Sequence, residues 1–225
     1  MSRAVQQMFD GIAPTYDTLN RVLSLGIDRS WRRRAIAALG DVRDRPVLDV
    51  CAGTLDLAAL AVDAGARVIA TDFSHQMLVA GRDNKARDKV RVPLVRADAL
   101  ALPFGDGGFA GVICGFGLRN LDDTRAGLAE MRRLIVPGGK LVVLDFFRPR
   151  RTVTRAVQAL YNQQILPLVG GAISGDRAAY RYLADSIERF AGRSEVEQMC
   201  REVGFASATS EDLTLGIASM VVASC

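Results

Sequence analysis

Short apolar runs alternate with stretches of helical periodicity from Pro46 onward, and this alternation constrains the fold more than any other feature of the sequence. Strands are predicted over residues 47–50, 67–71, 91–95, 109–114 and 140–146. The predicted helices between them cover residues 54–64, 74–87 and 122–135. Strands and helices that alternate in this way are typical of right-handed βαβ units, which build a parallel sheet covered by helices.

The two ends of the chain depart from this alternation. Near the start, apolar side chains at helical spacing predict helices over residues 4–13 and 28–39, with Asp28 as the N-cap of the second helix. Residues 152–190 contain further helical patterns but no strand. The alternation then returns with a helix over residues 194–203 and strands over residues 205–213 and 217–224.

The 225 residues fit a single domain. The predicted elements give it a Rossmann-like α/β fold, in which a mostly parallel seven-stranded sheet carries helices on both faces. We expect an N-terminal helical cap (1–40), a cofactor-binding core (41–147), an inserted helical lid (148–192) and a C-terminal part with the last helix and strands (193–225).

Composition excludes several kinds of site. His75 is the only histidine, so a site built from several histidines is excluded, and its position at a strand-to-helix junction predicts an exposed residue. The four cysteines are far apart in sequence, which favours reduced thiols over disulfides or a metal site. The chain lacks both an apolar run of roughly 20 residues and an apolar secretion signal, so we expect a cytoplasmic protein.

Positive charge is concentrated in one segment. The net charge of the chain is +4, and residues 147–193 hold eight arginines against three acidic residues. Basic runs with interleaved aromatic residues, which are typical of nucleic-acid binding, are absent, so no nucleic-acid partner is expected. The segment is either a solvated helix face or a surface for anionic lipid headgroups.

Acidic residues stand where three predicted strands end. Asp49 lies in the first strand, which runs into Gly53 and Thr54, Asp72 ends the second strand, and Asp98 follows the third. In an open parallel sheet, ligands bind beyond the carboxyl ends of the strands, and an acidic residue about 20 positions after the glycine turn binds ribose hydroxyls. The sequence therefore predicts a nucleoside site at this end of the sheet.

The glycine turn distinguishes between nucleosides. A dinucleotide requires Gly-x-Gly-x-x-Gly because its pyrophosphate must approach the backbone, whereas Gly53 is followed here by Leu55 and Asp56. A carboxylate suits S-adenosylmethionine (SAM), which has no phosphate and carries a positive sulfonium and ammonium. The sequence therefore favours a SAM-dependent enzyme over a nicotinamide-dependent oxidoreductase.

Four longer segments resemble the UbiE/MenG family, the C-methyltransferases that act on demethylmenaquinol and on the benzoquinol of the ubiquinone pathway. They are residues 20–32 (NRVLSLGIDRSWR), 116–120 (FGLRN), 137–144 (PGGKLVVL) and 180–190 (YRYLADSIERF). The resemblance covers nearly the whole chain. It implies an enzyme that transfers a methyl group from SAM, its cofactor, to a membrane-derived prenylated quinol.

The strand ends, the chemistry of methyl transfer and the resemblance together give a set of expected site residues; by the resemblance, Thr54, Asp72, Asp98, Ala99 and Gly115 would contact SAM. The expected cofactor-binding residues are Asp49, Gly53, Thr54, Asp72, Phe73, Met77, Asp98, Ala99 and Gly115. The expected catalytic residues are Arg119, Asn120 and Tyr180. Arg119 would stabilise the phenolate that forms on the quinol ring, and Asn120 would hold the ring oxygens. The proton acceptor stays open between water, Tyr180 and a nearby acid.

The sequence departs from the family pattern at several positions. Leu55 stands where the family has glycine, Ala110 where it has aspartate and Gly115 where serine is common, and a C-terminal His-x-Gly-x-Lys segment is missing. Two alternatives therefore stay open. One is a SAM methyltransferase for another small molecule, and the other is a catalytically degenerate protein that binds SAM or a partner.

A prenylated substrate adds a requirement for the protein surface. Its apolar tail resides in the membrane, so we expect peripheral contact with the inner face of the membrane. The weakly amphipathic, arginine-bearing residues 152–173 are the predicted contact surface. A homo-oligomer is compatible with the sequence, which does not specify the oligomeric state.

Overall fold

The computed structural model describes residues 3–84, 91–148 and 177–225. Its centre is a seven-stranded sheet with the strand order β3-β2-β1-β4-β5-β7-β6. The strands are β1 (Pro46–Val50), β2 (Arg67–Asp72), β3 (Leu94–Arg96), β4 (Phe109–Gly115), β5 (Ile135–Asp145), β6 (Ser207–Leu213) and β7 (Ala218–Ser224). β7 runs antiparallel to β5 and β6, while the other neighbouring strands pair in parallel. The predicted fold class is confirmed.

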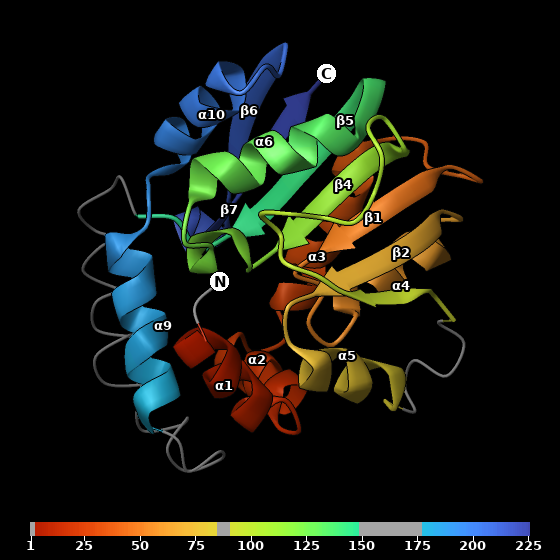
Figure 1. Ribbon diagram of the computed structural model, residues 1–225. Helices are drawn as coiled ribbons and strands as arrows, with labels where there is room; N and C mark the ends of the chain where they lie inside the picture. The colour runs from red at the N-terminus through yellow and green to blue at the C-terminus, as the bar shows by residue number, and fades with distance from the viewer. Residues whose placement is uncertain (1–2, 85–90, 149–176) are drawn as a thin grey trace.

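Helices cover both faces of the sheet (Figure 1). Helices α3 (Asp28–Leu39), α4 (Asp56–Asp63) and α5 (His75–Arg82) pack on one face, and α6 (Thr124–Leu134) and α10 (Arg193–Glu202) pack on the other. Successive side chains of a strand point to opposite faces of the sheet. Val47 therefore packs in the core under α3, α4 and α5, and Leu48 packs in the core under α6 and α10. This burial on both faces explains why the central strands are almost continuous apolar runs.

Three further helices lie at the end of the sheet where the parallel strands finish (Figure 1). They are α1 (Arg3–Ile12), α2 (Tyr16–Leu23) and α9 (Arg177–Arg189). Two short 3-10 helices stand at the same end, because η2 (Leu118–Asn120) follows β4 and η4 (Thr214–Gly216) joins β6 to β7.

The strand order reverses between β1 and β4. From β1 the chain proceeds outward to β2 and β3, and it then returns to place β4 and β5 on the other side. At such a point the connections leave the carboxyl ends of two neighbouring strands in opposite directions, which opens a crevice suited to a ligand. The fold therefore predicts a ligand site among the residues that follow β1, β2, β3 and β4.

Near the N-terminus the sequence misses one helix, and the predicted N-cap of another is wrong. The sequence pattern does not predict α2, which follows α1 after a short turn. Asp28 is the first residue of α3, and Ile27 occupies the N-cap position without a side-chain cap. The Asp28 carboxylate is instead buried, accepts a hydrogen bond from Ser24 Oγ at 2.7 Å and pairs with Arg32.

Several boundaries also differ from the predictions. β3 covers only Leu94–Arg96, and α5 ends at Arg82. β5 begins at Ile135, so the turn over residues 137–139 falls inside a strand whose pairing with β4 is irregular. Most of the predicted lid, including the contact surface over residues 152–173, lies outside the described residues. Within the described ranges no helix has the length and apolar character to cross a membrane.

Candidate functional site

The turn after β1 is built from residues in the left-handed backbone region. Cys51, Gly53 and Leu55 have φ angles of 57°, 53° and 70°. The Asp72 carboxylate holds this turn, because Oδ2 accepts a hydrogen bond from Gly53 N at 2.8 Å and Oδ1 accepts one from Ser74 N at 2.8 Å. Asp72 thereby joins the end of β1 to the start of α5.

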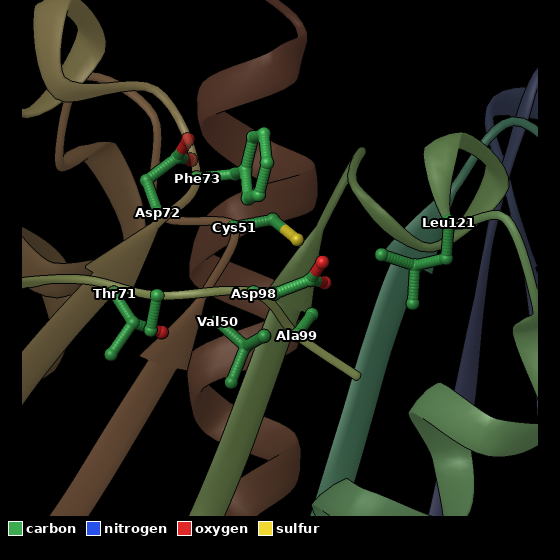
Figure 2. Close-up of a pocket in the computed structure, with 9 residues that line it drawn as sticks. Val50, Cys51, Thr71, Asp72, Phe73, Asp98, Ala99 and Leu121 are labelled. Carbon is green, nitrogen blue, oxygen red and sulfur yellow. The ribbon is translucent and has the colours of Figure 1, made fainter. Parts of the chain in front are cut away.

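A pocket lies where the strands end, beside this turn (Figure 2). It encloses about 220 Å³, including space open to solvent. Its lining residues are Val50, Cys51, Thr71, Asp72, Phe73, Ala97, Asp98, Ala99 and Leu121. Asp72 and Phe73 lie on one side, Leu121 lies on the other, and the Cys51 sulfur points toward the Asp98 carboxylate (Figure 2). The structure thus brings together four of the predicted cofactor residues.

The remaining lining residues were not among the predicted site residues. Val50 ends β1 and Cys51 follows it, Thr71 precedes Asp72, and Ala97 precedes Asp98. The rule that ligands bind at the carboxyl ends of strands could have located all four. Leu121, which directly follows the Phe-Gly-Leu-Arg-Asn segment, carries no such signal in the sequence.

Two buried carboxylates give the site its electrostatic character. Burial raises the pKa of Asp49 to about 8, and the positive charge of Arg32 offsets this only in part. Both Asp49 carboxylate oxygens are buried and lack a hydrogen-bond partner among the described residues. Burial also raises the pKa of Asp72 to about 6, although the N–H groups of Ser74 and Gly53 act in the opposite direction. A cationic ligand in this region would stabilise both ionised carboxylates, so the residues present fit SAM.

The Cys51 thiol lies against that of Cys114. A Cβ atom on Gly117 would lie 2.9 Å from Cys51 Sγ and 3.3 Å from Cys114 Sγ. Two effects raise the pKa of the Cys51 thiol well above its usual value: the larger is the hydrogen bond with Cys114, and the smaller is burial. Cys51 and Cys114 are both free thiols, in agreement with the prediction of reduced cysteines.

Four predicted cofactor residues surround the pocket without lining it. Gly53 forms the turn, and Met77 is buried, with Cε 3.9 Å from the position of a Cβ atom on Gly53. Thr54 is also buried. Gly115 ends β4, and a Cβ atom there would lie 2.3 Å from Leu57 Cδ1. Leu57 therefore occupies the space that the serine common in the family would need.

Leu55 does not obstruct the pocket. Its side chain is 1% exposed and belongs to the core under α3, α4 and α5. A Cβ atom on Gly81 would lie 2.6 Å from Leu55 Cγ, so Leu55 packs directly against α5. The substitution of leucine for the family's glycine is thus accommodated by a glycine on the neighbouring helix.

The N-terminal helices are fastened to residues around the site. Ser74 Oγ donates a hydrogen bond to Asp10 Oδ1 of α1 at 2.5 Å. Thr54 Oγ1 donates one to Asp17 Oδ1 of α2 at 2.5 Å, and Asn84 Nδ2 donates to the other Asp17 oxygen at 2.9 Å. Asp10 and Asp17 were not predicted, because each meets its partner only through the tertiary fold.

Arg119 belongs to η2, which follows β4, and its side chain is buried. Its Nη1 donates to Asp145 Oδ1 at 2.6 Å and to the Phe116 carbonyl at 2.6 Å. The guanidinium carbon lies 5.7 Å from the centre of the Phe146 ring. Arg119 Nε is buried and has no hydrogen-bond partner among the described residues. The arginine is thus held in one orientation by Asp145 and the Phe116 carbonyl.

Asn120 and Tyr182 form a second polar pair beside Arg119. Tyr182 Oη donates to Asn120 Oδ1 at 3.0 Å, and Asn120 Nδ2 donates to the Phe116 carbonyl at 3.2 Å. Tyr182 lies on α9 together with the predicted catalytic residue Tyr180, whose side chain is outside the described part of the structure.

Tyr16 of α2 is a polar side chain near Arg119 that the sequence pattern did not indicate. Burial raises the pKa of its phenol, while the charges of Arg32 and Arg119 and a hydrogen bond with Asn20 lower it by less. The first helices therefore supply a hydroxyl group close to two arginines.

The family model of the ubiE/COQ5 methyltransferases matches residues 1–224. The chain belongs to the ubiE/COQ5 methyltransferase family. This confirms the resemblance drawn from the sequence, and with it the predicted class of enzyme, a SAM-dependent methyltransferase.

Members of the ubiE/COQ5 family share much of this sequence. The chain is 44% identical to the demethylmenaquinone methyltransferase of Deinococcus radiodurans over 98% of its own length and 92% of the relative's. It is 40% identical to the ubiquinone/menaquinone biosynthesis C-methyltransferase UbiE of Geotalea uraniireducens over 97% of its own length and 94% of the relative's.

A solved structure supports the fold of this family member. The SAM-dependent methyltransferase of Thermotoga maritima superposes with a TM-score of 0.69, covering 96% of this chain and 98% of the other. The two sequences are only 16% identical, so the comparison concerns the fold alone.

Proposed function

We propose that the chain transfers the methyl group of SAM to a ring carbon of a prenylated quinol, either demethylmenaquinol or the equivalent benzoquinol of the ubiquinone pathway. The observation that carries this proposal is the pocket at the carboxyl ends of β1, β2 and β3, whose lining residue Leu121 directly follows the segment that holds the buried Arg119. The names of the relatives at 44% and 40% identity supply the substrate class.

In this proposal the strand ends bind SAM. Asp72 accepts hydrogen bonds from the ribose hydroxyls, and Asp98 and Ala99 meet the adenine. Asp49, whose buried carboxylate lacks a hydrogen-bond partner among the described residues, would ionise as the ammonium group binds and supply the opposite charge. When bound, SAM supplies a methyl group that is already activated by the positive sulfur.

The chain then positions and activates the acceptor. Alignment of two reactants in one site can lower a barrier by roughly 7–11 kcal/mol. The quinol carbon becomes nucleophilic as a ring hydroxyl loses its proton, and the Arg119 guanidinium stabilises the resulting phenolate. Arg119 stays charged throughout, so it does not accept that proton itself. Asn120, oriented by Tyr182, holds a ring oxygen.

The helices at the carboxyl end of the sheet form the substrate side of the site in this proposal. α1 and α2 serve as the cap, and α9 belongs to the lid. Together they exclude water from the reacting groups, which strengthens the electrostatic effect of Arg119.

The decisive experiment is mass spectrometry of products formed from methyl-labelled SAM and demethylmenaquinol. We expect a labelled methyl group on the quinol ring. Arg119→Ala should abolish the product while calorimetry still detects SAM binding. SAM binding without any labelled quinol would contradict the proposal and favour a protein that binds SAM without turnover. Methylation of a soluble small molecule in place of the quinol would favour a different methyltransferase.

A further inference from the structure

Two leucines project from turns at the carboxyl end of the sheet. Leu25, between α2 and α3, is 86% exposed, and Leu215, in η4, is 82% exposed. Their φ angles are 51° and 58°, and a glycine follows each. A left-handed conformation is unfavourable for leucine, yet the fold uses it twice to hold a large apolar side chain in solvent.

The two turns belong to one rigid surface. Trp31 Nε1, near the start of α3, donates a hydrogen bond to Thr214 Oγ1 at 2.8 Å. One turn further along α3, Arg34 Nη2 lies 2.8 Å from Glu211 Oε2 of β6. α3 therefore fixes the position of Leu25 relative to Leu215.

Two more apolar side chains extend this surface. Val22 and Ile27, which flank Leu25, are 43% and 39% exposed. Val22, Leu25, Ile27 and Leu215 are the large apolar residues with marked exposure among the described residues. We call these four residues the leucine face. Three of them lie within residues 22–27, and Trp31 joins the adjoining helix to the turn that holds the fourth, so their exposure is not scattered over the chain.

Positive charge borders the leucine face. Arg21, Arg29 and Arg33 are exposed, and Arg29 and Arg33 lie one turn apart on α3. The neighbouring acidic residues are paired with cations, namely Asp28 with Arg32, Glu211 with Arg34 and Asp212 with Arg193. The exposed charge next to the leucines is therefore positive.

We propose that the leucine face docks on an anionic lipid bilayer. Separate apolar side chains at turn tips can insert between lipid headgroups, and arginines bind headgroup phosphates. The inference rests on the proposed function in one respect, which is that a prenylated quinol must be drawn from a membrane. Docking in this orientation turns the carboxyl end of the sheet, and with it the pocket, toward the bilayer.

The test measures binding of the full chain to vesicles made of equal parts phosphatidylcholine and phosphatidylglycerol. Leu25→Asn and Leu215→Asn remove the apolar side chains, and asparagine tolerates the left-handed conformation, so folding is preserved. We expect each substitution to weaken binding about ten-fold or more, since insertion of a leucine contributes at least that factor. Unchanged binding in the double variant would overturn the proposal.

The charge requirement has a matched control. Arg29→Glu with Arg33→Glu should reduce vesicle binding at low salt, by about five-fold or more for each position. Arg43→Glu with Arg45→Glu makes the same change in charge just before β1, at the opposite end of the sheet, and should have little effect. Equal losses in the two double variants would mean that net charge alone drives binding, against a defined docking face.

Trp31 provides an independent measurement, because it is the only tryptophan and lies beside η4. Vesicles with brominated acyl chains should quench its fluorescence, and Leu25→Asn with Leu215→Asn should remove the quenching. If ultracentrifugation instead showed a dimer that these substitutions dissociate, the face would be covered by a second copy and the proposal would fail.

Activity separates this inference from the proposed function. The double leucine variant should methylate a soluble short-chain quinol at the parent rate but lose turnover of a long-chain quinol supplied in vesicles. Vesicle binding through the leucine face without methylation of either quinol would contradict the proposed function and leave the docking surface standing. Loss of turnover on both quinols would indicate a role inside the site and overturn the docking role.

Discussion

Arg119 and Asp145 form an ion pair shut away from solvent: Arg119 Nη1 lies 2.6 Å from Asp145 Oδ1, and the two side chains are 6% and 0% exposed. Asp145 ends β5, and its carboxylate also accepts hydrogen bonds from the backbone N–H groups of Arg119 and Phe146. The aspartate thus positions both the side chain and the backbone of the arginine to which the proposed function gives the central role.

Asp145→Asn should destabilise the fold and abolish methyl transfer. Removing one partner of a buried ion pair typically costs about 3–5 kcal/mol, because the other charge stays buried without compensation. Urea unfolding measures the loss of stability. The double variant Arg119→Met with Asp145→Leu should recover much of the stability but none of the activity. An active double variant would contradict the role of Arg119.

The pKa values of Asp49 and Asp72 predict a pH-dependent stability. Both are raised above the usual value for aspartate, to about 8 and about 6. Between about pH 4 and pH 8 the folded state therefore keeps protons on these carboxyl groups that the unfolded state has released. The contribution of the two groups to stability should be most favourable below about pH 4 and should fall as the pH rises to about 8. Urea midpoints across this range measure the effect.

Asp49→Asn is the matched variant for that pH series. The substitution removes the fall in stability between about pH 6 and pH 8, which Asp49 alone causes. Stability should therefore stop falling near pH 6, where the Asp72 carboxyl has titrated. At pH 8 the variant should be more stable than the parent but bind SAM more weakly, because it lacks the negative charge. An unchanged pH profile would show that Asp49 is not the buried acid that titrates.

Gly117→Ala should disturb the pocket. A Cβ atom at this position would lie 2.3 Å from Cys51 Cβ, which is close to the backbone and cannot move freely. We expect lower stability and weaker SAM binding, measured by thermal unfolding and calorimetry. Gly105→Ala is the control, since a Cβ atom there meets nothing within 4 Å. Cys51→Gly in the Gly117→Ala background should restore stability.

Leu55→Gly tests the balance between strain and packing at the glycine turn. Glycine would relieve the left-handed conformation, which costs leucine roughly 1–2 kcal/mol. It would also empty a buried leucine site, and truncations of this kind cost about 2–5 kcal/mol. We expect net destabilisation in urea. A more stable variant would show that the packing of Leu55 against Gly81 contributes little.

Asp17→Ala should loosen the N-terminal helices. Its carboxylate accepts hydrogen bonds from Thr54, in the turn after β1, and from Asn84, which follows α5, so its loss removes two polar contacts that hold α2 in place. We expect faster amide hydrogen exchange in α2 and weaker SAM binding, with little change in the exchange of β4 and β5. Equal acceleration throughout the sheet would indicate global destabilisation instead.

Much of the fold could be predicted because its information is local. β1, β2 and β4 are apolar runs that are buried on both faces, and each is bounded by a glycine or a polar turn. The positions of Asp72 and Asp98 follow from the same reading, since the end of a strand is also the edge of the crevice. Asp145 stands at the end of a predicted strand as well, so this rule could have indicated it.

Other parts of the site depend on contacts that no local pattern contains. Asp10 and Ser74 are 64 positions apart, and Asp17 and Thr54 are 37 positions apart, so each pair forms only after the helices dock. The direction of the Leu55 side chain could not be predicted from the sequence either, because it follows from a left-handed backbone conformation that leucine seldom adopts.

The raised pKa of Cys51 has a consequence for an enzyme that handles an alkylating agent. On the proposed function, this sulfur faces the same pocket as SAM, and a thiolate there would compete with the quinol for the methyl group. Its contact with Cys114 keeps it as a neutral thiol, which is a poor nucleophile. On the proposed function, the contact between the two sulfurs would therefore disfavour methylation of Cys51 by SAM.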